Sequence, residues 1–366
     1  MANILEYLDW RGDLTLLERP FNEVDNLILA EICYLDFSGF VPAGFQTQQV
    51  TLLDAASAYF AAHPETNMGV LVPDQIPVLV EHAAKTARFS DVRLLGYVNR
   101  IDEETQTQFS ALTMLLPDGS AYVAFRGTDD TIVGWKEDFN MAFRYPVPAQ
   151  HAACEYVCAV ARLWRGPMVL LGHSKGGNLA VYAAMNASDE VKDRVERIYS
   201  LDGPGFPEAV VNSFEYSSVS DRIVKIVPDS SVVGMVLETP ERCMVVKSDV
   251  EGIMQHFACS WQMHGGEFDK VEDVANSSVT FNKALNKWLS NLSKEQRERA
   301  VDALFAVLEA SGAGSISAMM AAGPKVIPEM LGTYVGLSIE DRRNLNQALG
   351  IMLQAALARN PKVRRR

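Results

Sequence analysis

A serine lies between two glycines in Gly172-His173-Ser174-Lys175-Gly176, directly after the apolar run Val169 to Leu171. Small and apolar residues of helical character follow it. A strand, a sharp turn and a helix in this order hold a serine in a strained backbone conformation, with its hydroxyl exposed at the sheet edge. We expect glycines at 172 and 176 because a side chain there would collide with the neighbouring strand or helix. Ser174 is therefore the candidate nucleophile.

A serine hydroxyl reacts only when a base removes its proton, and a third group must orient that base. In proteins with this strand-turn-helix nucleophile the chain order is Ser, then Asp or Glu, then His. The two histidines downstream of Ser174 are His256 and His264. His256 follows a predicted strand at 243–247 and is the candidate base, with His264 as the alternative. His173 precedes the nucleophile and is expected to be structural.

Two aspartates follow predicted strands downstream of the serine and are candidates for the orienting acid. Asp229 lies between Pro228 and small residues, as in an exposed loop at a strand end. Asp202 precedes Gly-Pro-Gly, which is typical of a turn. We therefore favour Asp229 as the acid and keep Asp202 as the alternative.

An oxyanion hole needs two N–H groups aimed at the developing negative charge. One comes from the residue after the nucleophile, here Lys175, and the other from an earlier loop between a strand and a helix. The loop Arg126-Gly127-Thr128-Asp129 follows a predicted strand and is the natural donor. Thr128 is expected to supply both its N–H and its hydroxyl.

Strands alternate with helices around these residues. Residue patterns predict strands at 92–101, 109–116, 120–125, 169–172, 197–201, 222–227 and 243–247. Pro117-Asp118-Gly119 predicts a hairpin turn. Such alternation predicts a mostly parallel central sheet with helices on both faces, in which ligands bind at the carboxyl ends of the strands. The candidate catalytic and oxyanion residues all follow the carboxyl ends of predicted strands.

Helical patterns extend on both sides of this core. We expect a helical segment over 1–89 packed on a core of 90–270, and a helical region over 271–366 that ends in a basic tail. Helices are expected at 22–34, 48–62 and 74–89. The stretch 312–336 is rich in Gly and Met and is interrupted by Pro324 and Pro328. It is open to two interpretations, a mobile lid or a packed loop, and we favour the loop.

Composition restricts the class of protein. The 366 residues carry a net charge of −13, which argues against a nucleic-acid partner. The first ten residues show no secretory signal pattern, and no apolar run is long enough to span a membrane. The five scattered cysteines favour buried thiols in a reducing compartment over disulfides or a zinc site. Together these features predict a cytoplasmic protein with at most peripheral membrane contact.

Residues 90 to 265 resemble the class 3 (fungal-type) lipases. Three segments carry the resemblance: Phe125-Arg126-Gly127-Thr128 followed by Trp135 and Asp138, Gly172-His173-Ser174-Lys175-Gly176-Gly177, and Tyr199-Ser200-Leu201-Asp202-Gly203-Pro204. The resemblance implies an α/β-hydrolase fold and places the acid at Asp229, and it implies that Arg126 and Asp138 are structural partners. The family usually has Leu where this chain has Lys175, so we expect the pocket to gain a charge. The whole chain resembles a bacterial branch of lipase-like proteins.

These features predict a serine hydrolase that cleaves carboxylic esters, of small molecules or lipids, through an acyl-enzyme on Ser174 without metal or cofactor. Acyl transfer to another acceptor would use the same residues, and a lipase-like scaffold that has lost turnover is the alternative from another class. The segments before residue 90 and around Met319-Met320 are apolar but lack a basic face. We therefore expect a partly covered pocket, short-chain or soluble esters, and little rate increase at lipid interfaces.

Overall fold

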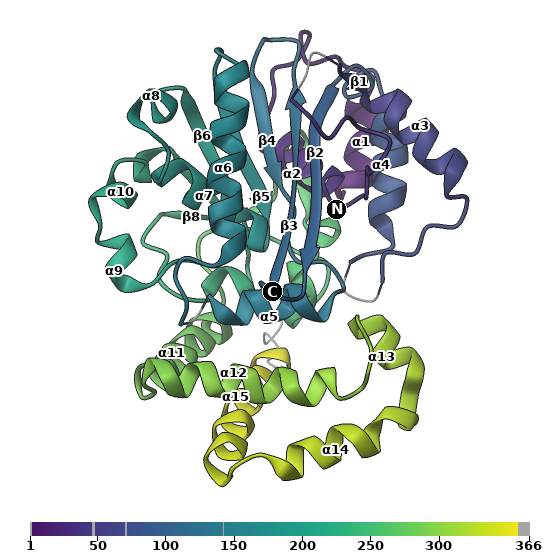
Figure 1. The fold of residues 1–366 in the computed structure, drawn as a ribbon. Coiled ribbons are helices and arrows are strands. Elements are labelled where there is room, and N and C mark those ends of the chain that lie inside the picture. The colour runs from purple at the N-terminus through teal and green to yellow at the C-terminus, as the bar shows by residue number, and fades with distance from the viewer. Residues whose placement is uncertain (1, 46–47, 70–71, 142, 358–366) are drawn as a thin grey trace, which may run out of the picture.

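The computed structural model describes residues 2–45, 48–69, 72–141 and 143–357, and the basic tail at 361–366 lies outside these ranges. Within them, nine strands form one sheet in the order β1-β2-β3-β4-β5-β6-β7-β8-β11 (Figure 1). The strands are β1 (Val50–Thr51), β2 (Arg93–Asp102), β3 (Thr107–Leu115), β4 (Ala121–Phe125), β5 (Met168–His173), β6 (Val195–Leu201), β7 (Ile223–Pro228), β8 (Cys243–Val246) and β11 (Lys270–Val271). Strands β4 to β8 run parallel, and the outer strands pair antiparallel.

Strand β5 shows why this sheet is buried on both faces. Val169 and Leu171 belong to one hydrophobic core and Met168 and Leu170 to the other, because successive side chains of a strand point to opposite faces. The expected hairpin joins β3 to β4, where Gly119 adopts φ 83°. The seven strands expected from the sequence are all present, with ends that differ by a few residues.

Helices cover both faces of the sheet (Figure 1). One face carries the N-terminal helices, and the other carries the helices on either side of β5. The N-terminal helices are α1 (Ile4–Arg11), α2 (Glu23–Ile32), α3 (Leu52–Ala62) and α4 (Gln75–Lys85). The opposite face has α6 (Pro148–Leu163) and α7 (Lys175–Met185), with the short helices α8 (Asp189–Lys192), α9 (Glu208–Val211) and α10 (Phe214–Ser217) nearby. This arrangement is the α/β-hydrolase fold expected from the sequence.

The C-terminal helices lie below the core in Figure 1, next to α5 (Ile132–Asn140). They are α11 (Asn276–Ser290), α12 (Lys294–Glu309), α13 (Ile316–Ala322), α14 (Ile327–Gly336) and α15 (Ile339–Leu357). The contact with α5 is apolar: Ile132 packs with Val301 and Phe305 of α12. Hydrophobic burial therefore joins the C-terminal helices to a core segment that follows the Arg126–Asp129 loop.

The preference for a packed loop over 312–336 is wrong, because most of this stretch is helical. Pro324 lies in the first turn of the short 3₁₀ helix Gly323–Val326, and Pro328 lies in the first turn of α14. Proline is tolerated there because the first N–H groups of a helix have no partner within it. The two prolines therefore mark helix starts, and neither α13 nor α14 has a buried residue.

Candidate active site

Ser174 lies in the sharp turn between β5 and α7 and adopts φ 57°, ψ −132°, a conformation that non-glycine residues rarely take. The flanking residues must be glycines because neither position has room for a Cβ. A Cβ on Gly172 would lie 2.2 Å from the carbonyl carbon of Gly176, and one on Gly176 would lie 2.0 Å from the backbone oxygen of Phe125. The collisions expected with the helix and the neighbouring strand are therefore confirmed.

His256 ends the short helix Gly252–His256, and its ring is oriented by Asp202. Nδ1 of His256 lies 2.6 Å from Oδ2 of Asp202, whose side chain is fully buried. The other carboxylate oxygen accepts hydrogen bonds from the Ser231 hydroxyl at 2.5 Å and from the Gly234 N–H at 3.2 Å. These bonds hold the carboxylate in one orientation, so its free oxygen faces the imidazole.

The structure therefore corrects the choice of Asp229 as the partner of His256. Asp229 follows β7, and its buried Oδ1 has no hydrogen-bond partner among the described residues. Asp202 follows β6, which lies next to the nucleophile strand β5, whereas β7 is one strand farther away. The loop that carries His256 therefore lies at the end of β6, the strand next to the nucleophile strand, and not at the end of β7. His264 lies on β9 (Met263–His264), where it is exposed.

His173 contacts the candidate base directly, although the sequence marked it only as structural. Its ring stacks on that of His256 with centroids 4.6 Å apart, and its Nε2 lies 2.8 Å from the His256 carbonyl oxygen. A carbonyl only accepts, so Nε2 carries the hydrogen, and Nδ1 accepts the Tyr34 hydroxyl at 2.9 Å. The residue before the nucleophile thus fixes the backbone of His256 beside Ser174.

Glu31 and Tyr34 come from the N-terminal segment and were not indicated by any sequence motif. Glu31 is buried, with Oε1 3.3 Å from Nδ1 of His173. Burial raises the pKa of Glu31 to about 8, and burial together with nearby His256 lowers the pKa of His173 to about 3. Both groups are therefore neutral at pH 7, which agrees with the single tautomer that the hydrogen bonds assign to His173.

Replacing Glu31 by Gln should change how stability depends on pH. Between pH 4.5 and 8 folded Glu31 holds a proton that the unfolded chain has lost, so the free energy of unfolding falls as pH rises. The fall is at most about 1.4 kcal/mol per pH unit. The buried neutral His173 contributes an opposite slope below about pH 6.5, and this contribution is common to the wild type and the variant. Urea unfolding at pH 5, 6, 7 and 8 should therefore show that the stability of the wild type relative to Glu31→Gln falls with this slope as pH rises. The exposed Glu81→Gln should keep the wild-type slope, and parallel curves for all three proteins would mean that Glu31 is ionised in the fold.

The Arg126–Asp129 loop lies against the nucleophile. A Cβ on Gly127 would lie 2.9 Å from Cβ of Ser174 and 2.1 Å from the Tyr34 hydroxyl oxygen, so only glycine lets the loop come this close. The hydroxyl of Thr128 donates to Asp138. Of the two groups expected from Thr128, the hydroxyl is thus bonded to Asp138, and the N–H is the group left as a candidate oxyanion donor.

The side chain of Lys175 does not add a charge to the pocket, contrary to expectation. It is fully buried, with Nζ 2.9 Å from the Gln108 backbone oxygen and 3.1 Å from Oε2 of Glu137. Oδ1 of Asp138 lies 3.7 Å away. Burial raises the pKa of Asp138 to about 6, and Lys175 and the Thr128 hydroxyl oppose this rise. The Lys175 ammonium thus connects β3, through Gln108, and α5, through Glu137, to the turn that carries Ser174.

Replacing Lys175 by Met should destabilise the fold. The methionine keeps the length of the side chain but leaves Glu137 as a buried carboxylate without its cation, which costs about 3–5 kcal/mol. Lys85→Met is the matched control, because the Lys85–Glu81 pair is exposed and is worth less than about 1 kcal/mol. Chemical unfolding of both variants measures the difference, and equal stabilities would show that the buried network contributes nothing.

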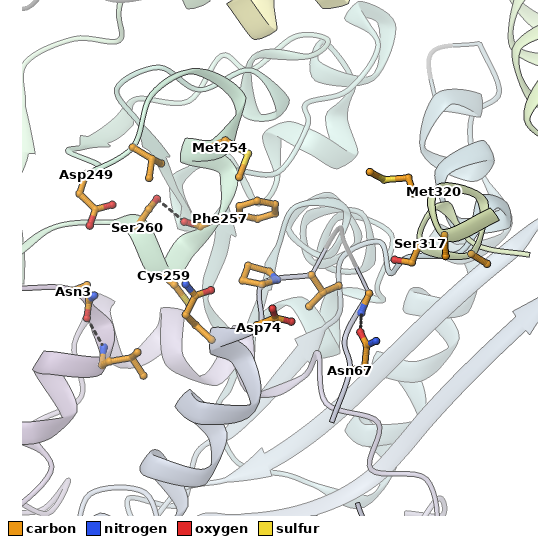
Figure 2. Close-up of a pocket in the computed structure, with 18 residues that line it drawn as sticks. Asn3, Asn67, Asp74, Asp249, Met254, Phe257, Cys259, Ser260, Ser317 and Met320 are labelled. Atoms are coloured by element: carbon orange, nitrogen blue, oxygen red, sulfur yellow. Dashed lines mark hydrogen bonds between the residues drawn. The ribbon is translucent and has the colours of Figure 1, made fainter. Parts of the chain in front are cut away.

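A pocket of about 1040 Å³ adjoins the base. It lies between the η3 turn (Gly252–His256) with the residues after it, residues 67–69 and 72–75, and α13 (Figure 2). Among the described residues no group of three His, Cys, Asp or Glu side chains is placed to hold a metal ion. No described helix has the length and apolar character needed to cross a membrane.

The chain was compared with solved structures, with curated proteins and with protein families. Three solved structures are similar to the chain at TM-scores of 0.36–0.37. The M37 lipase is 13% identical (TM-score 0.36), and the match covers 59% of this chain and 69% of that one. A triacylglycerol lipase whose catalytic centre is a serine protease triad is 12% identical (TM-score 0.37; 62% of this chain and 80% of that one), and a Rhizomucor miehei lipase propeptide complex is 13% identical (TM-score 0.36; 62% of this chain and 70% of that one). At these values the likeness says nothing of activity. No curated protein matches the chain in sequence. The model of the Mbeg1-like family matches residues 83–306, more than half of the chain, and the protein therefore belongs to the Mbeg1-like family.

Proposed function

We propose that this protein is a serine hydrolase of carboxylic esters, with Ser174 as nucleophile, His256 as base and Asp202 as the acid that orients it. The observation that carries the proposal is the 2.6 Å contact between His256 Nδ1 and the buried Asp202 carboxylate, made by a histidine whose ring stacks on that of the residue before a serine at positive φ. An ordinary surface serine needs neither a strained turn nor a histidine held by a buried carboxylate.

The reaction follows from the roles of these groups. Asp202 accepts the Nδ1 hydrogen of His256, which leaves Nε2 free to take the proton of the Ser174 hydroxyl. The serine oxygen attacks the ester carbonyl carbon, and the oxyanion accepts hydrogen bonds from the N–H groups of Thr128 and Lys175. The protonated histidine then gives its proton to the leaving alcohol. Water, activated by the same base, hydrolyses the acyl-enzyme and releases the acid.

Labelling with a fluorophosphonate tests whether Ser174 is activated, because the reagent phosphonylates a serine only when a base assists it. The folded wild type should be labelled within minutes at a single site, and peptide mass mapping should place the adduct on Ser174. Heat-denatured protein is the control and should stay unlabelled. A folded wild type that does not react would favour the alternative of a scaffold that has lost turnover.

A further inference from the structure

The pocket beside the base joins three parts of the chain that are distant in sequence. Met254 and Phe257, on either side of His256, form one wall, and Met320 of α13 faces them across the opening (Figure 2). Residues 67–69 and 72–75 form the floor, on which Figure 2 labels Asn67 and Asp74. The pocket thus reaches Met254, two positions before the proposed base, and Phe257, directly after it, while His256 and Ser174 themselves do not line it.

Hydrogen bonds place α13 against the proposed oxyanion loop. The N–H of Ile316 donates to the Asp130 backbone oxygen at 3.0 Å, and the N–H of Ser317 donates to the Asp130 carboxylate at 3.1 Å. Asp130 is two residues after Thr128. A Cβ on Gly69 would lie 2.6 Å from the same Asp130 side chain, so Gly69 meets the chain there as well. The wall formed by α13 and the floor at Gly69 therefore both meet Asp130, the residue directly after the proposed oxyanion loop.

The lining is mainly apolar and has no positive charge. More than half of the 18 lining residues are apolar, and the charged ones are Asp74 and Asp249. Met254 and Met320 are 51% and 59% exposed, although methionine is usually buried. Flexible thioether side chains adapt to apolar ligands of different shape. An uncharged apolar ligand would cover both methionines, whereas an anionic one would meet two carboxylates.

We propose that this pocket binds the uncharged acyl chain of the ester substrate and that α13 is the wall that selects chain length. The inference rests on the proposed function, since the chain is joined to the carbonyl that Ser174 attacks. A volume of about 1040 Å³ is at the upper end of the range for small-ligand sites and would be almost empty with an acetyl group. The site therefore prefers acyl chains longer than the short ones expected from the sequence.

The test compares p-nitrophenyl acetate with p-nitrophenyl octanoate, below its solubility limit, on wild type and Met320→Trp. The indole reaches farther into the pocket than the thioether, so the ratio of kcat/KM for octanoate to that for acetate should fall at least tenfold. Ala318→Trp, on the same helix and also lining the pocket, should act in the same direction. Ratios within twofold of wild type in both variants would overturn the proposal.

Leu331→Trp is the matched control, because Leu331 is 52% exposed on α14 and does not line the pocket. This substitution should leave kcat/KM unchanged for both octanoate and acetate. The mono-p-nitrophenyl ester of suberic acid, an eight-carbon chain that ends in a carboxylate, tests the charge of the lining. Wild type should use it less well than octanoate, and the difference should shrink in salt because exposed charges are screened. A preference for the suberate ester would contradict an uncharged ligand.

A binding measurement separates failure of the pocket from failure of the proposed function. Ser174→Ala should bind the neutral dye Nile red, 1-octanol should displace it, and adding Met320→Trp should weaken the binding at least tenfold. If no ester is hydrolysed but this binding holds, the proposed function is wrong and the pocket remains a site for apolar chains. If the esters are hydrolysed and the dye does not bind, the acyl pocket lies elsewhere.

Discussion

Ser174→Ala should lower kcat for p-nitrophenyl acetate by on the order of 10⁴- to 10⁶-fold, because no other group can form the acyl-enzyme. The alanine keeps a Cβ, so the positive φ of the turn is as costly as in the wild type. The methyl group also leaves the hydrogen bond from the backbone N–H of residue 174 to the Leu201 oxygen unchanged. We therefore expect a folded protein with nearly unchanged stability and almost no activity.

The experiment measures initial rates and thermal unfolding of the wild type and the variant side by side. Lys85→Met is a suitable control, since it alters an exposed ion pair on α4, away from the site. It should keep full activity. If Ser174→Ala retained more than a tenth of the wild-type rate while folded, another residue would have to be the nucleophile, and the proposed function would fail.

Asp202→Asn should lower kcat by on the order of 10⁴-fold. The amide can keep the oxygen that accepts from Ser231 and Gly234, and asparagine tolerates the φ of 47° at this position. Its NH₂ group then faces Nδ1 of His256 and donates to it. The imidazole must carry its hydrogen on Nε2, where it cannot accept the proton of Ser174. The loss is therefore a loss of turnover with little change in KM.

Asp229→Asn is the matched control for this result. The substitution has the same size and the same change in charge, but Asp229 has no contact with the base in the described structure. Its kcat should stay within about threefold of wild type, because the substitution leaves the contact between Asp202 and His256 in place. A 10⁴-fold loss in Asp229→Asn with near-normal turnover in Asp202→Asn would restore the acid chosen from the sequence.

The sequence by itself determined the elements and the turn that presents the serine. The apolar run before Gly172 has the length of a buried strand, and Gly172 and Gly176 allow the close approach of α7 and β4 that the elbow requires. Alternation of strands and helices determined the parallel sheet. The position of Gly127 next to Ser174 was also accessible, because parallel strands bring their carboxyl ends to one edge. These properties are local or follow from the order of the elements.

Only the tertiary structure decided which strand end meets His256. Asp202 and Asp229 both follow strands, and nothing in the local pattern says whether the loop around residue 256 folds over β6 or β7. The direction of the Lys175 side chain is a similar case. Whether a lysine at an elbow faces solvent or is buried depends on Glu137, which comes from a helix 38 positions earlier in the chain.

The same limit applies to the parts contributed by the two ends of the chain. Tyr34 reaches His173, and α13 reaches Asp130, across distances in sequence that no motif spans. The helices that precede these residues, α2 and α12, bury apolar side chains against the core. Hydrophobic burial is non-directional, so it selects the helix face that is buried but does not select the partner of a polar atom. Which polar groups pair is decided only by the final position of each helix against the core. That position is known from the tertiary structure alone.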